Sequence, residues 1–156
     1  ERDSDELPEW RGGKFITIID EGVFNTDDYK NVRDFIKRNF YIKAIISLTQ
    51  DTFVPVSKTP AKTSILYLIK KEDPDAKQQE PTFYAHASKV GKDTKGRACD
   101  NHLINQKNKD VLRKYFEFKE IVKKSYRGNQ FDKNKFQSLG FKEDWFDEEW
   151  WNISLL

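Results

Sequence analysis

The stretch Lys14-Phe15-Ile16-Thr17-Ile18-Ile19 is a short, nearly continuous run of apolar and β-branched residues. Such a run predicts a β-strand that is buried on both faces, as in a parallel sheet. Before it, residues 1–13 are polar and end in Arg11-Gly12-Gly13, which predicts a loop that leads into the strand. After it, Asp20-Glu21-Gly22 predicts a turn.

A helix is predicted after this turn, over residues 26–39. Thr26 is a suitable N-cap, and Asp27 and Asp28 lie in the first turn, where the helix dipole favours negative charge. The expected apolar face consists of Tyr29, Val32, Phe35, Ile36 and Phe40. A second buried strand is predicted at residues 42–48. Strand, helix and strand in this order predict a βαβ unit, with a parallel pair of strands.

The remaining elements complete an α/β pattern. A third strand is predicted at residues 63–69, antiparallel to the second because the loop 49–62 is too short for a crossover helix. Residues 82–87 predict a fourth strand, and we expect the last strands to be antiparallel. Residues 90–101 predict a polar loop. A second helix is predicted over residues 106–126, with Val111, Leu112, Tyr115, Phe118 and Val122 on one face.

The composition indicates one folded domain with a small core. The chain has 156 residues, of which 37% are hydrophobic and 35% are charged, whereas about 45–50% and about 25% are usual. Aromatic residues make up 14%, and disordered chains are poor in aromatic residues. Methionine is absent, even at position 1. We therefore expect an excised or processed piece of a longer protein.

Several classes of protein are excluded by simple features. A single cysteine, Cys99, excludes an internal disulfide and favours a reducing, cytoplasmic location. No apolar run approaches the 18 or so residues of a membrane span, so we expect no membrane association. The acidic residues 1–6 do not form a signal peptide.

Charge is segregated along the chain, although the net charge is only +2. Residues 106–130 hold eight basic and three acidic side chains, and residues 141–156 hold five acidic side chains and one lysine. A basic helix can follow phosphate groups, but a solvated helix face is an equally good interpretation. The acidic, tryptophan-rich tail is expected to dock on that helix or on another domain.

No catalytic or metal-binding constellation is visible. His86 and His102 are sixteen residues apart, which is not a zinc-ligand spacing, and His86 is best interpreted as a structural histidine within a strand. Cys99 has no histidine or asparagine placed by sequence to activate it. Neither a Gly-x-Gly-x-x-Gly motif nor a phosphate-binding P-loop occurs.

Four segments, in this order, resemble the N6-adenine DNA methyltransferases. They are RGGKFITIIDEGVF at 11–24, IKAIISL at 42–48 with Phe53, KTSILYL at 62–68, and SKVGKDTKGR at 88–97 with Asn-His-Leu at 101–103. Within that family, the segments resemble the methylation (M) subunits of type I restriction–modification systems and related single-chain enzymes. The resemblance covers about residues 10–120 and corresponds to the C-terminal half of the catalytic domain.

The resemblance implies the C-terminal part of a Rossmann-like class I sheet with a helical C-terminal extension. Residues 14–19, 42–48 and 63–69 would be its fifth, sixth and antiparallel seventh strands. The expected organisation is a polar segment at 1–10, a partial methyltransferase domain at 11–104, and an extension at 105–156 that stands beyond the sheet.

Two motifs of the family are missing from the sequence. These are the Gly-rich methyl-donor loop and the catalytic Asn/Asp-Pro-Pro-Tyr/Phe tetrapeptide; no two of the five prolines are adjacent. Both motifs would precede residue 10, so no catalytic residue is predicted in this chain, and we expect the isolated fragment to be inactive. S-adenosylmethionine would be bound mainly by residues absent from this chain.

The family methylates the amino group of an adenine flipped out of DNA, which implies roles for several residues. Phe53 would form an aromatic wall for the flipped base, although a core position beneath the hairpin is an equal alternative. Glu21 and Asn25 would lie at the ligand-binding mouth, at the carboxyl end of the first strand. The cations that would contact the DNA backbone, with ordinary solvated side chains as the alternative, are Lys58, Lys62, Lys92 and Arg97.

The expected partners are DNA and the specificity and nuclease subunits or domains of a restriction–modification complex. The alternative function is a non-catalytic nucleic-acid-binding or protein-interaction α/β module. This alternative is suggested by the basic helix and the acidic tail.

Overall fold

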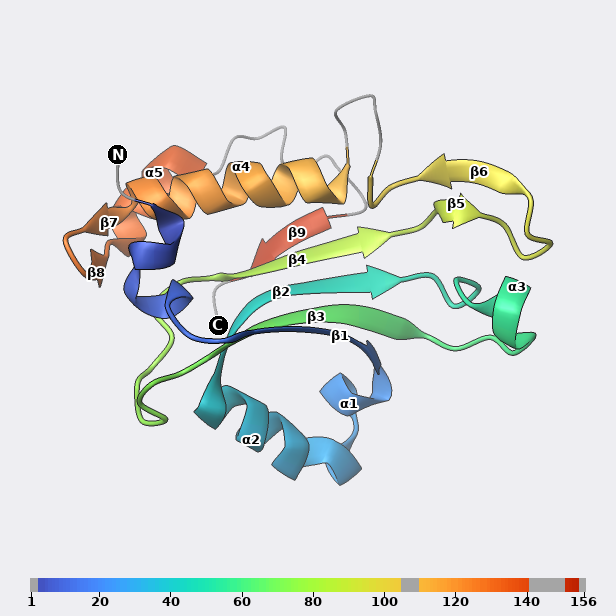
Figure 1. Ribbon diagram of the computed structural model, residues 1–156, viewed down its shortest axis with the longest axis horizontal. Coiled ribbons are helices and arrows are strands. Elements are labelled where there is room, and N and C mark those ends of the chain that lie inside the picture. The colour runs from blue at the N-terminus through green and yellow to red at the C-terminus, as the bar shows by residue number, and fades with distance from the viewer. Residues whose placement is uncertain (1–2, 105–109, 141–150, 155–156) are drawn as a thin grey trace.

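The computed structural model describes residues 3–104, 110–140 and 151–154, and it has a mixed α/β fold (Figure 1). Its main sheet has the strand order β1-β3-β2-β4-β9. These strands are β1 (Lys14–Asp20), β2 (Phe40–Leu48), β3 (Thr63–Lys70), β4 (Thr82–Ala87) and β9 (Trp151–Ser154). Two small ribbons pair β5 (Val90–Lys92) with β6 (Ala98–Asn101) and β7 (Tyr126–Arg127) with β8 (Gln130–Phe131).

Helices cover both faces of the main sheet (Figure 1). The α-helices of the described residues are α1 (Gly22–Asn25), α2 (Lys30–Asn39), α3 (Val54–Ser57), α4 (Val111–Lys124) and α5 (Lys133–Gly140), and α3 lies beyond the ends of the strands. Helix α4 lies along one face, and α1 and α2 lie on the other. Three short 3-10 helices are η1 (Ser4–Glu6), η2 (Pro8–Trp10) and η3 (Asp27–Tyr29). No described helix has both the length and the apolar character needed to cross a membrane.

Strand β3 lies between β1 and β2 and is antiparallel to both. Lys14 of β1 pairs with Ile69, and Ser47 of β2 pairs with Ser64. The predicted antiparallel pairing of the second and third strands is therefore confirmed. Strands β1 and β2 run in the same direction, as expected of a βαβ unit, but the prediction that they pair directly is wrong. A local sequence pattern gives the direction of a strand and not its neighbour.

Strand β1 is the edge strand of the main sheet, and its side chains are largely exposed. The exposed fractions of Phe15, Ile16 and Ile18 are 52%, 65% and 52%. The prediction that this strand is buried on both faces is wrong within the described residues. Its apolar run is typical of a central strand, but among the described strands only β3 pairs with it.

The segment between β1 and β2 is helical over more of its length than predicted, with a break in it. Helix α1 begins at Gly22, where a turn was predicted, and η3 separates it from α2. Thr26 is not a side-chain N-cap: its hydroxyl donates back to Gly22 O at 2.9 Å. Of the predicted apolar face, Ile36 packs on the core, whereas Phe35 is 61% exposed and Phe40 already belongs to β2.

The fourth strand has the predicted bounds but a different direction. Strand β4 pairs in parallel with β2, with Ser47 opposite His86, so the prediction of antiparallel last strands is wrong for this pair. The predicted polar loop at 90–101 is instead the β5–β6 ribbon. At the far edge, β9 pairs with β4 in antiparallel orientation. Most of the acidic tail, residues 141–150, lies outside the described residues.

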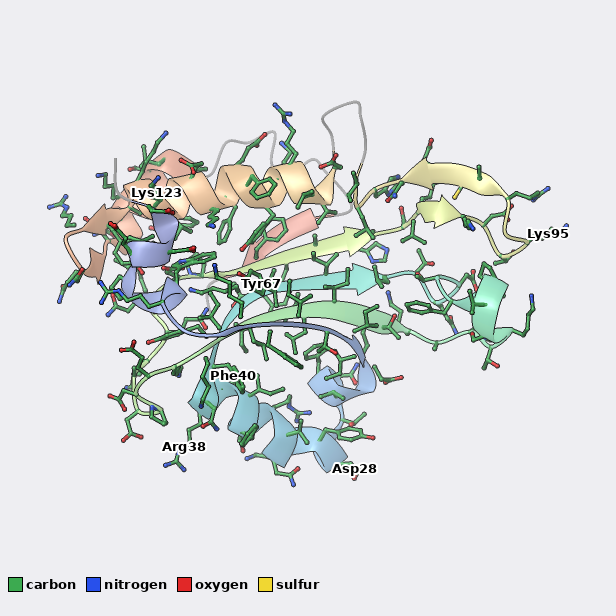
Figure 2. The ribbon with its side chains drawn as sticks, viewed as in Figure 1. Asp28, Arg38, Phe40, Tyr67, Lys95 and Lys123 are labelled. Atoms are coloured by element: carbon green, nitrogen blue, oxygen red, sulfur yellow. The ribbon has the colours of Figure 1, made fainter. Side chains whose placement is uncertain are left out.

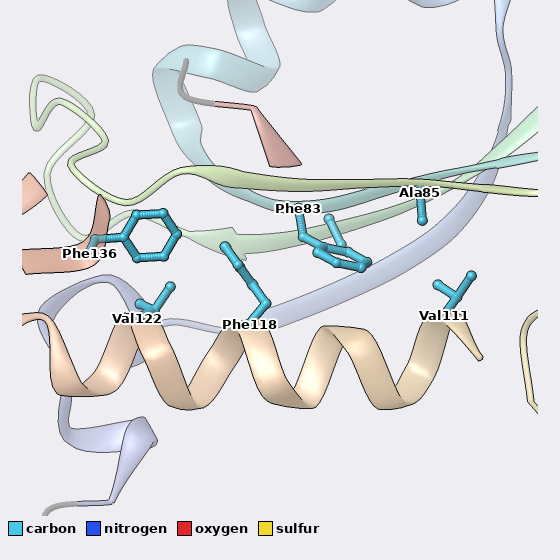
Figure 3. Close-up of a cluster of buried hydrophobic side chains, with 7 residues drawn as sticks. Phe83, Ala85, Val111, Phe118, Val122 and Phe136 are labelled. Carbon is cyan, nitrogen blue, oxygen red and sulfur yellow. The ribbon is translucent and has the colours of Figure 1, made fainter. Parts of the chain in front are cut away.

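Helix α4 packs on the main sheet and does not stand beyond it (Figure 3). Its buried side chains contact Phe83 and Ala85 of β4 and Phe136 of α5 in one cluster; they are Val111, Phe118 and Val122. Asp110 caps the helix by accepting a hydrogen bond from the amide of Arg113 at 2.7 Å. Leu112, predicted on the buried face, is 41% exposed.

The N-terminal segment is anchored in the core, in contrast to the predicted polar loop. Leu7 and Trp10 are each 2% exposed and cluster with Ile69 of β3. The indole Nε1 of Trp10 donates to the carboxylate of Glu80 at 2.9 Å. Glu9 accepts a hydrogen bond from the amide of Gln79. These contacts fix the segment against the residues that immediately precede β4.

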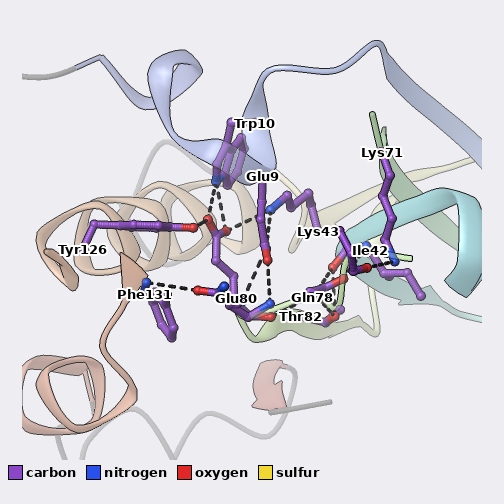
Figure 4. Close-up of polar contacts among 12 residues, drawn as sticks. Glu9, Trp10, Ile42, Lys43, Lys71, Gln78, Glu80, Thr82, Tyr126 and Phe131 are labelled. Carbon is purple, nitrogen blue, oxygen red and sulfur yellow. Dashed lines mark hydrogen bonds and ion pairs between the residues drawn. The ribbon is translucent and has the colours of Figure 1, made fainter. Parts of the chain in front are cut away.

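A buried ionic network surrounds these contacts (Figure 4). Lys43 of β2 lies 2.9 Å from Glu80 and 3.4 Å from Glu9, and all three are nearly fully buried. Tyr126 donates its hydroxyl hydrogen to Glu80. Burial raises the pKa of Glu9, and the neighbouring Glu80 carboxylate adds to this effect although Lys43 opposes it. The network lies at the amino end of β4, away from the site described next.

Candidate functional site

The carboxyl ends of β1, β2 and β4 lie at one edge of the main sheet, on the right in Figure 1. Two structures extend beyond this edge: the 49–62 loop with α3, and the β5–β6 ribbon. Folds with parallel strands bind ligands at the carboxyl ends of those strands. This carboxyl edge is therefore the candidate functional site.

A row of polar side chains crosses three strands just inside the carboxyl edge. The strand register places Ser47 opposite Ser64 on one side and opposite His86 on the other. Residues directly opposite one another share a face of the sheet. The row does not continue into β1, because the residue opposite Ser64 there is the apolar Ile19.

Glu21 follows β1 and joins this row. Its Oε1 accepts hydrogen bonds from Ser47 Oγ at 2.5 Å and Ser64 Oγ at 2.9 Å. Partial burial acts to raise the pKa of Glu21, but the two serine hydrogen bonds and the nearby Lys62 outweigh it, and the net shift is downward. Glu21 is thus held as a carboxylate. The sequence predicted Glu21 at this edge, and the structure places it there.

Lys62 contacts the ends of two strands at once. Its Nζ donates to Ser47 Oγ at 2.7 Å and to the carbonyl of Leu48, and lies 3.5 Å from Glu21 Oε1. Its own carbonyl accepts a hydrogen bond from the Glu21 amide at 3.0 Å. The side chain that was predicted to touch phosphate therefore lies inside the polar row.

His86 completes the row on β4. Its Nδ1 lies 3.3 Å from Ser47 Oγ. Burial lowers the pKa of His86, and the Lys62 charge lowers it further. This contact agrees with its interpretation as a hydrogen-bonded structural histidine.

Phe53 lies on the loop that leaves β2. It is half-buried and belongs to none of the buried hydrophobic clusters found among the described residues. Its carbonyl accepts hydrogen bonds from the amide of Ser57 at 2.8 Å and from the Ser57 hydroxyl at 2.9 Å. The base of the loop is closed by a hydrogen bond from Ala61 N to Gln50 O at 3.0 Å.

Lys58 lies on the same loop, next to the end of α3. Its backbone adopts a left-handed conformation with φ of 61°. Its Nζ donates to the carbonyl of Pro55, within the loop itself, at 3.0 Å. Lys58 is exposed and is not part of the polar row.

The β5–β6 ribbon carries two further predicted DNA-contacting residues, and Lys95 marks its tip in Figure 2. Arg97 is engaged within the ribbon: its Nε and Nη2 each lie 2.8 Å from Asp93 Oδ2. The amide of Arg97 is the largest of the hydrogen-bonding influences that lower the pKa of Asp93. Lys92 is exposed on the same ribbon.

Asn25 stands apart from the other predicted site residues. It ends α1 and is exposed, and within the described ranges no hydrogen bond joins it to the polar row. The sequence interpretation also missed Ser47 and Ser64 as site residues. Their only signal was a hydroxyl inside each apolar strand, and their proximity became visible only from the register of β2 and β3.

A cavity of about 340 Å³ lies beside the row, between α2 and the sheet. Its polar lining includes Glu21, Ser47 and Ser64, and its apolar lining includes Ile42 and Ile45. The remaining lining residues include Arg33, Lys37 and Tyr84. Across the described ranges, no group of three His, Cys, Asp or Glu side chains is placed to hold a metal ion.

Comparison with known proteins identifies the family. The family model of the N-6 DNA methylases matches residues 10–136, which is most of the chain. The chain therefore belongs to the N-6 DNA methylase family.

One solved structure is also similar, a proposed class I S-adenosylmethionine-dependent methyltransferase from Listeria monocytogenes. It is 31% identical, with a TM-score of 0.38, over 48% of this chain and 22% of that chain. The present chain thus spans about a fifth of the length of that protein. No curated protein gives a match.

Proposed function

We propose that the chain is the target-base side of an S-adenosylmethionine-dependent DNA adenine-N6 methyltransferase. We further propose that it serves a restriction–modification system, as the resemblance to type I methylation subunits implies. The family match supports the coarser assignment. The proposal that this chain forms the target-base side rests on one observation. The Phe53 loop, Glu21 and the basic β5–β6 ribbon all lie at the same carboxyl edge of the sheet.

In this proposal Phe53 stacks on the target adenine. The ring lies on a loop whose base is hydrogen-bonded and whose backbone is fixed by Ser57. Stacking of a base on an aromatic ring contributes about 1–3 kcal/mol. Because Phe53 is only half-buried and lies outside the buried clusters of the described chain, the stacking role is favoured over a core role.

The exposed lysines of the same edge would bind the nucleic-acid backbone. Lys58 is exposed on the loop, and Lys92 and Lys95 are exposed on the ribbon. Arg97 is oriented by Asp93 and would contribute more to the shape of the ribbon than to phosphate binding. Lysines on two separate arms can follow a backbone without reading its sequence.

The methyl donor would be bound elsewhere. S-adenosylmethionine, when bound, supplies the electrophilic methyl group. At the end of β1, the Oε1 atom of Glu21 is already engaged by Ser47, Ser64 and Lys62, so only its second oxygen could face a donor. The Gly-rich loop and the Pro-Pro tetrapeptide of the family are also missing from the sequence.

The remainder of the methyltransferase is proposed to pack against the β1 edge. A groove of about 430 Å³ lies between β1, β3 and α4, and apolar side chains line most of it. Ile16, Ile104 and Phe116 in this groove are 65%, 64% and 54% exposed. An exposed edge strand beside an apolar groove is a favourable site for strand pairing. The specificity and nuclease subunits expected from the resemblance stay predictions.

The alternative function, a nucleic-acid-binding module that uses the basic helix, is less well supported. On α4, Glu117 lies 3.9 Å from Arg113 and 3.6 Å from Lys114. Lys119 lies over the ring of Trp10 at 4.6 Å from its centroid. Much of the positive charge on this helix is therefore engaged within the protein.

The proposal is tested with a single-stranded oligonucleotide that contains one 2-aminopurine, whose fluorescence falls on stacking. We expect the 156-residue chain to bind it at low salt and to quench it. Phe53→Ala should weaken binding by about tenfold, from the stacking energy of about 1–3 kcal/mol per base. Val56→Ala is the matched control, because Val56 is 85% exposed on the same loop. Absence of binding at low salt, or equal quenching by wild type and Phe53→Ala, would contradict the proposal.

A further inference from the structure

We propose that Lys62 and Glu21 are positioning residues that hold the Phe53 loop, and not nucleic-acid contacts. The inference rests on the proposed function, since it concerns how the stacking residue is placed. It also changes the roles suggested by the sequence, where Lys62 was a phosphate contact and Glu21 a substrate contact.

The first argument is the position of Lys62 in the chain. It is the last residue of the 49–62 loop, immediately before β3. Its carbonyl accepts the Glu21 amide from the end of β1, and its Nζ donates to the Leu48 carbonyl at the end of β2. Strands β1 and β2 are not neighbours in the sheet. Lys62 therefore ties together the ends of three strands and fixes one end of the loop.

The second argument is the donor capacity of the ammonium group. A lysine ammonium has three N–H donors. Three oxygen atoms lie near Nζ: Ser47 Oγ at 2.7 Å, the Leu48 carbonyl, and Glu21 Oε1 at 3.5 Å. The contacts to Ser47 and Leu48 are hydrogen bonds and the contact to Glu21 is an ion pair, so a phosphate oxygen would have to compete with Glu21 for the third donor. Binding to phosphate would therefore disrupt the arrangement that holds the loop.

The third argument is charge. Glu21 lies beside Lys62 and is itself held by the hydroxyls of Ser47 and Ser64. The pair is close to neutral as a unit, so it attracts a polyanion weakly. Hydrogen bonds between charged groups are roughly twice as strong as those between neutral groups. The pair is thus better suited to fixing local geometry than to binding nucleic acid.

Lys58 offers the contrasting case on the same loop. Among the described residues its Nζ has one hydrogen bond, to the carbonyl of Pro55 within the loop, and its side chain is exposed. Two of its three donors remain available for a phosphate group. Lys58→Met is therefore the matched control for Lys62→Met: the same chemical change is made on the same loop, without any tie to β1 or β2.

The experiment combines two measurements on the full chain. Hydrogen exchange of the loop amides, such as Ala61 and Ser57, reports whether the loop is held. Quenching of the 2-aminopurine single strand reports whether Phe53 is placed. We expect Lys62→Met to speed loop exchange by about tenfold, as local opening becomes easier, and to weaken quenching. Amides of β4 should be unchanged. Lys62→Arg should restore both signals.

If Lys62→Met does not fold, a second variant tests the same inference. Glu21→Gln keeps an oxygen acceptor for the serines and removes the charge, so we expect the same direction of change at smaller size. Lys58→Met should leave loop exchange unchanged. In a plot of the logarithm of the binding constant against the logarithm of the salt concentration, Lys58→Met should make the slope shallower by about 0.7, because one phosphate contact to a single strand is lost.

The outcomes separate this inference from the proposed function. If wild type neither binds nor quenches the oligonucleotide, the proposed function fails, and loop exchange in Lys62→Met still decides the positioning role. If wild type quenches and Lys62→Met leaves exchange unchanged, the positioning role is overturned. A reduced salt dependence in Lys62→Met with unchanged exchange would also overturn it, in favour of a phosphate contact.

Discussion

The ammonium of Lys43 lies 2.9 Å from the carboxylate of Glu80, and the side chain of each is 1% exposed. Lys43 sits in β2 between the apolar residues Ile42 and Ala44, and Glu80 precedes β4. A second carboxylate, Glu9, lies 3.4 Å from the same ammonium. Since Trp10 and Tyr126 also donate to Glu80, this pair connects four separate parts of the chain.

Replacement of the buried cation should destabilise the fold strongly. Lys43→Ala leaves two buried carboxylates without a positive partner, and loss of one member of a buried pair typically costs about 3–5 kcal/mol. The free energy of unfolding in urea measures this. Lys30→Ala is the control: Lys30 and Asp34 are also 2.9 Å apart, but their side chains are 73% and 60% exposed. Such an exposed pair contributes little to stability, because solvent screens its charges. Similar losses in both variants would contradict the prediction.

The same network should make stability depend on pH. Burial raises the pKa of Glu9 above its ordinary value of 4.5. The folded chain then holds this proton more tightly than the unfolded chain, so stability falls as the pH rises from about 4.5 through the raised pKa. We expect the advantage of wild type over Glu9→Gln in the free energy of unfolding to shrink from pH 4 to pH 8.

Asp34→Asn is the control for this pH titration, because the pKa of Asp34 is shifted downward where that of Glu9 is shifted upward. Hydrogen bonding to Lys30 lowers the pKa of Asp34 below 3.8, so any stabilisation by this carboxylate is lost only as the pH falls through the lowered value. The difference between wild type and Asp34→Asn should therefore be constant from pH 5 to pH 8. A constant difference for Glu9→Gln over that range would show that its pKa is not raised.

Two phenylalanines on α4 test whether this helix belongs to the core. Phe118 packs between Phe83 and Phe136, with ring centroids 5.4 and 5.9 Å away. Phe118→Ala should cost about 3–5 kcal/mol, the usual loss for a buried phenylalanine. Phe116→Ala should cost far less, because Phe116 is 54% exposed. Thermal or urea unfolding distinguishes them, and equal losses would mean that α4 is not packed as described.

The two glycines before β1 are expected to differ sharply. A Cβ atom on Gly12 would lie 1.9 Å from the carbonyl oxygen of Lys70, whereas nothing lies within 4 Å of one on Gly13. Gly12→Ala must displace backbone and should cost about 1–3 kcal/mol, in the range of overpacking substitutions. Gly13→Ala should change stability by no more than about 0.5 kcal/mol. Urea denaturation of the two variants checks this, and equal stability would argue against the close approach of Gly12 to β3.

The strands were predictable where the sequence alone determines them. Residues 42–48 and 63–69 are largely apolar runs with β-branched residues, residues 82–87 hold two aromatic residues, and the observed strands have nearly the same bounds. The neighbour relations were not predictable, because the insertion of β3 between β1 and β2 depends on long-range packing. For the same reason Lys43 could not be matched with Glu9 and Glu80, which come from distant segments with no local signal.

The site was predictable in location more than in detail. Glu21 is at the carboxyl edge, as its place after the first predicted strand indicated. The engagement of Lys62 with Glu21 depends on the register of β3 against its two neighbours, which no local pattern reveals. The roles of Phe53 and of the exposed lysines stay predictions.

The place of β3 in the sheet also sets the order in which the chain can assemble. Lys14 pairs with Ile69, so β1 is synthesised long before the strand that holds it. At about 5–20 residues per second, the wait during translation is on the order of seconds. Throughout that interval β1, an apolar strand that contains Ile16 and Ile18, lacks β3, the strand with which it pairs in the described fold. The slow step in folding is therefore expected to be the return of β3, and a holding chaperone would act most usefully before it.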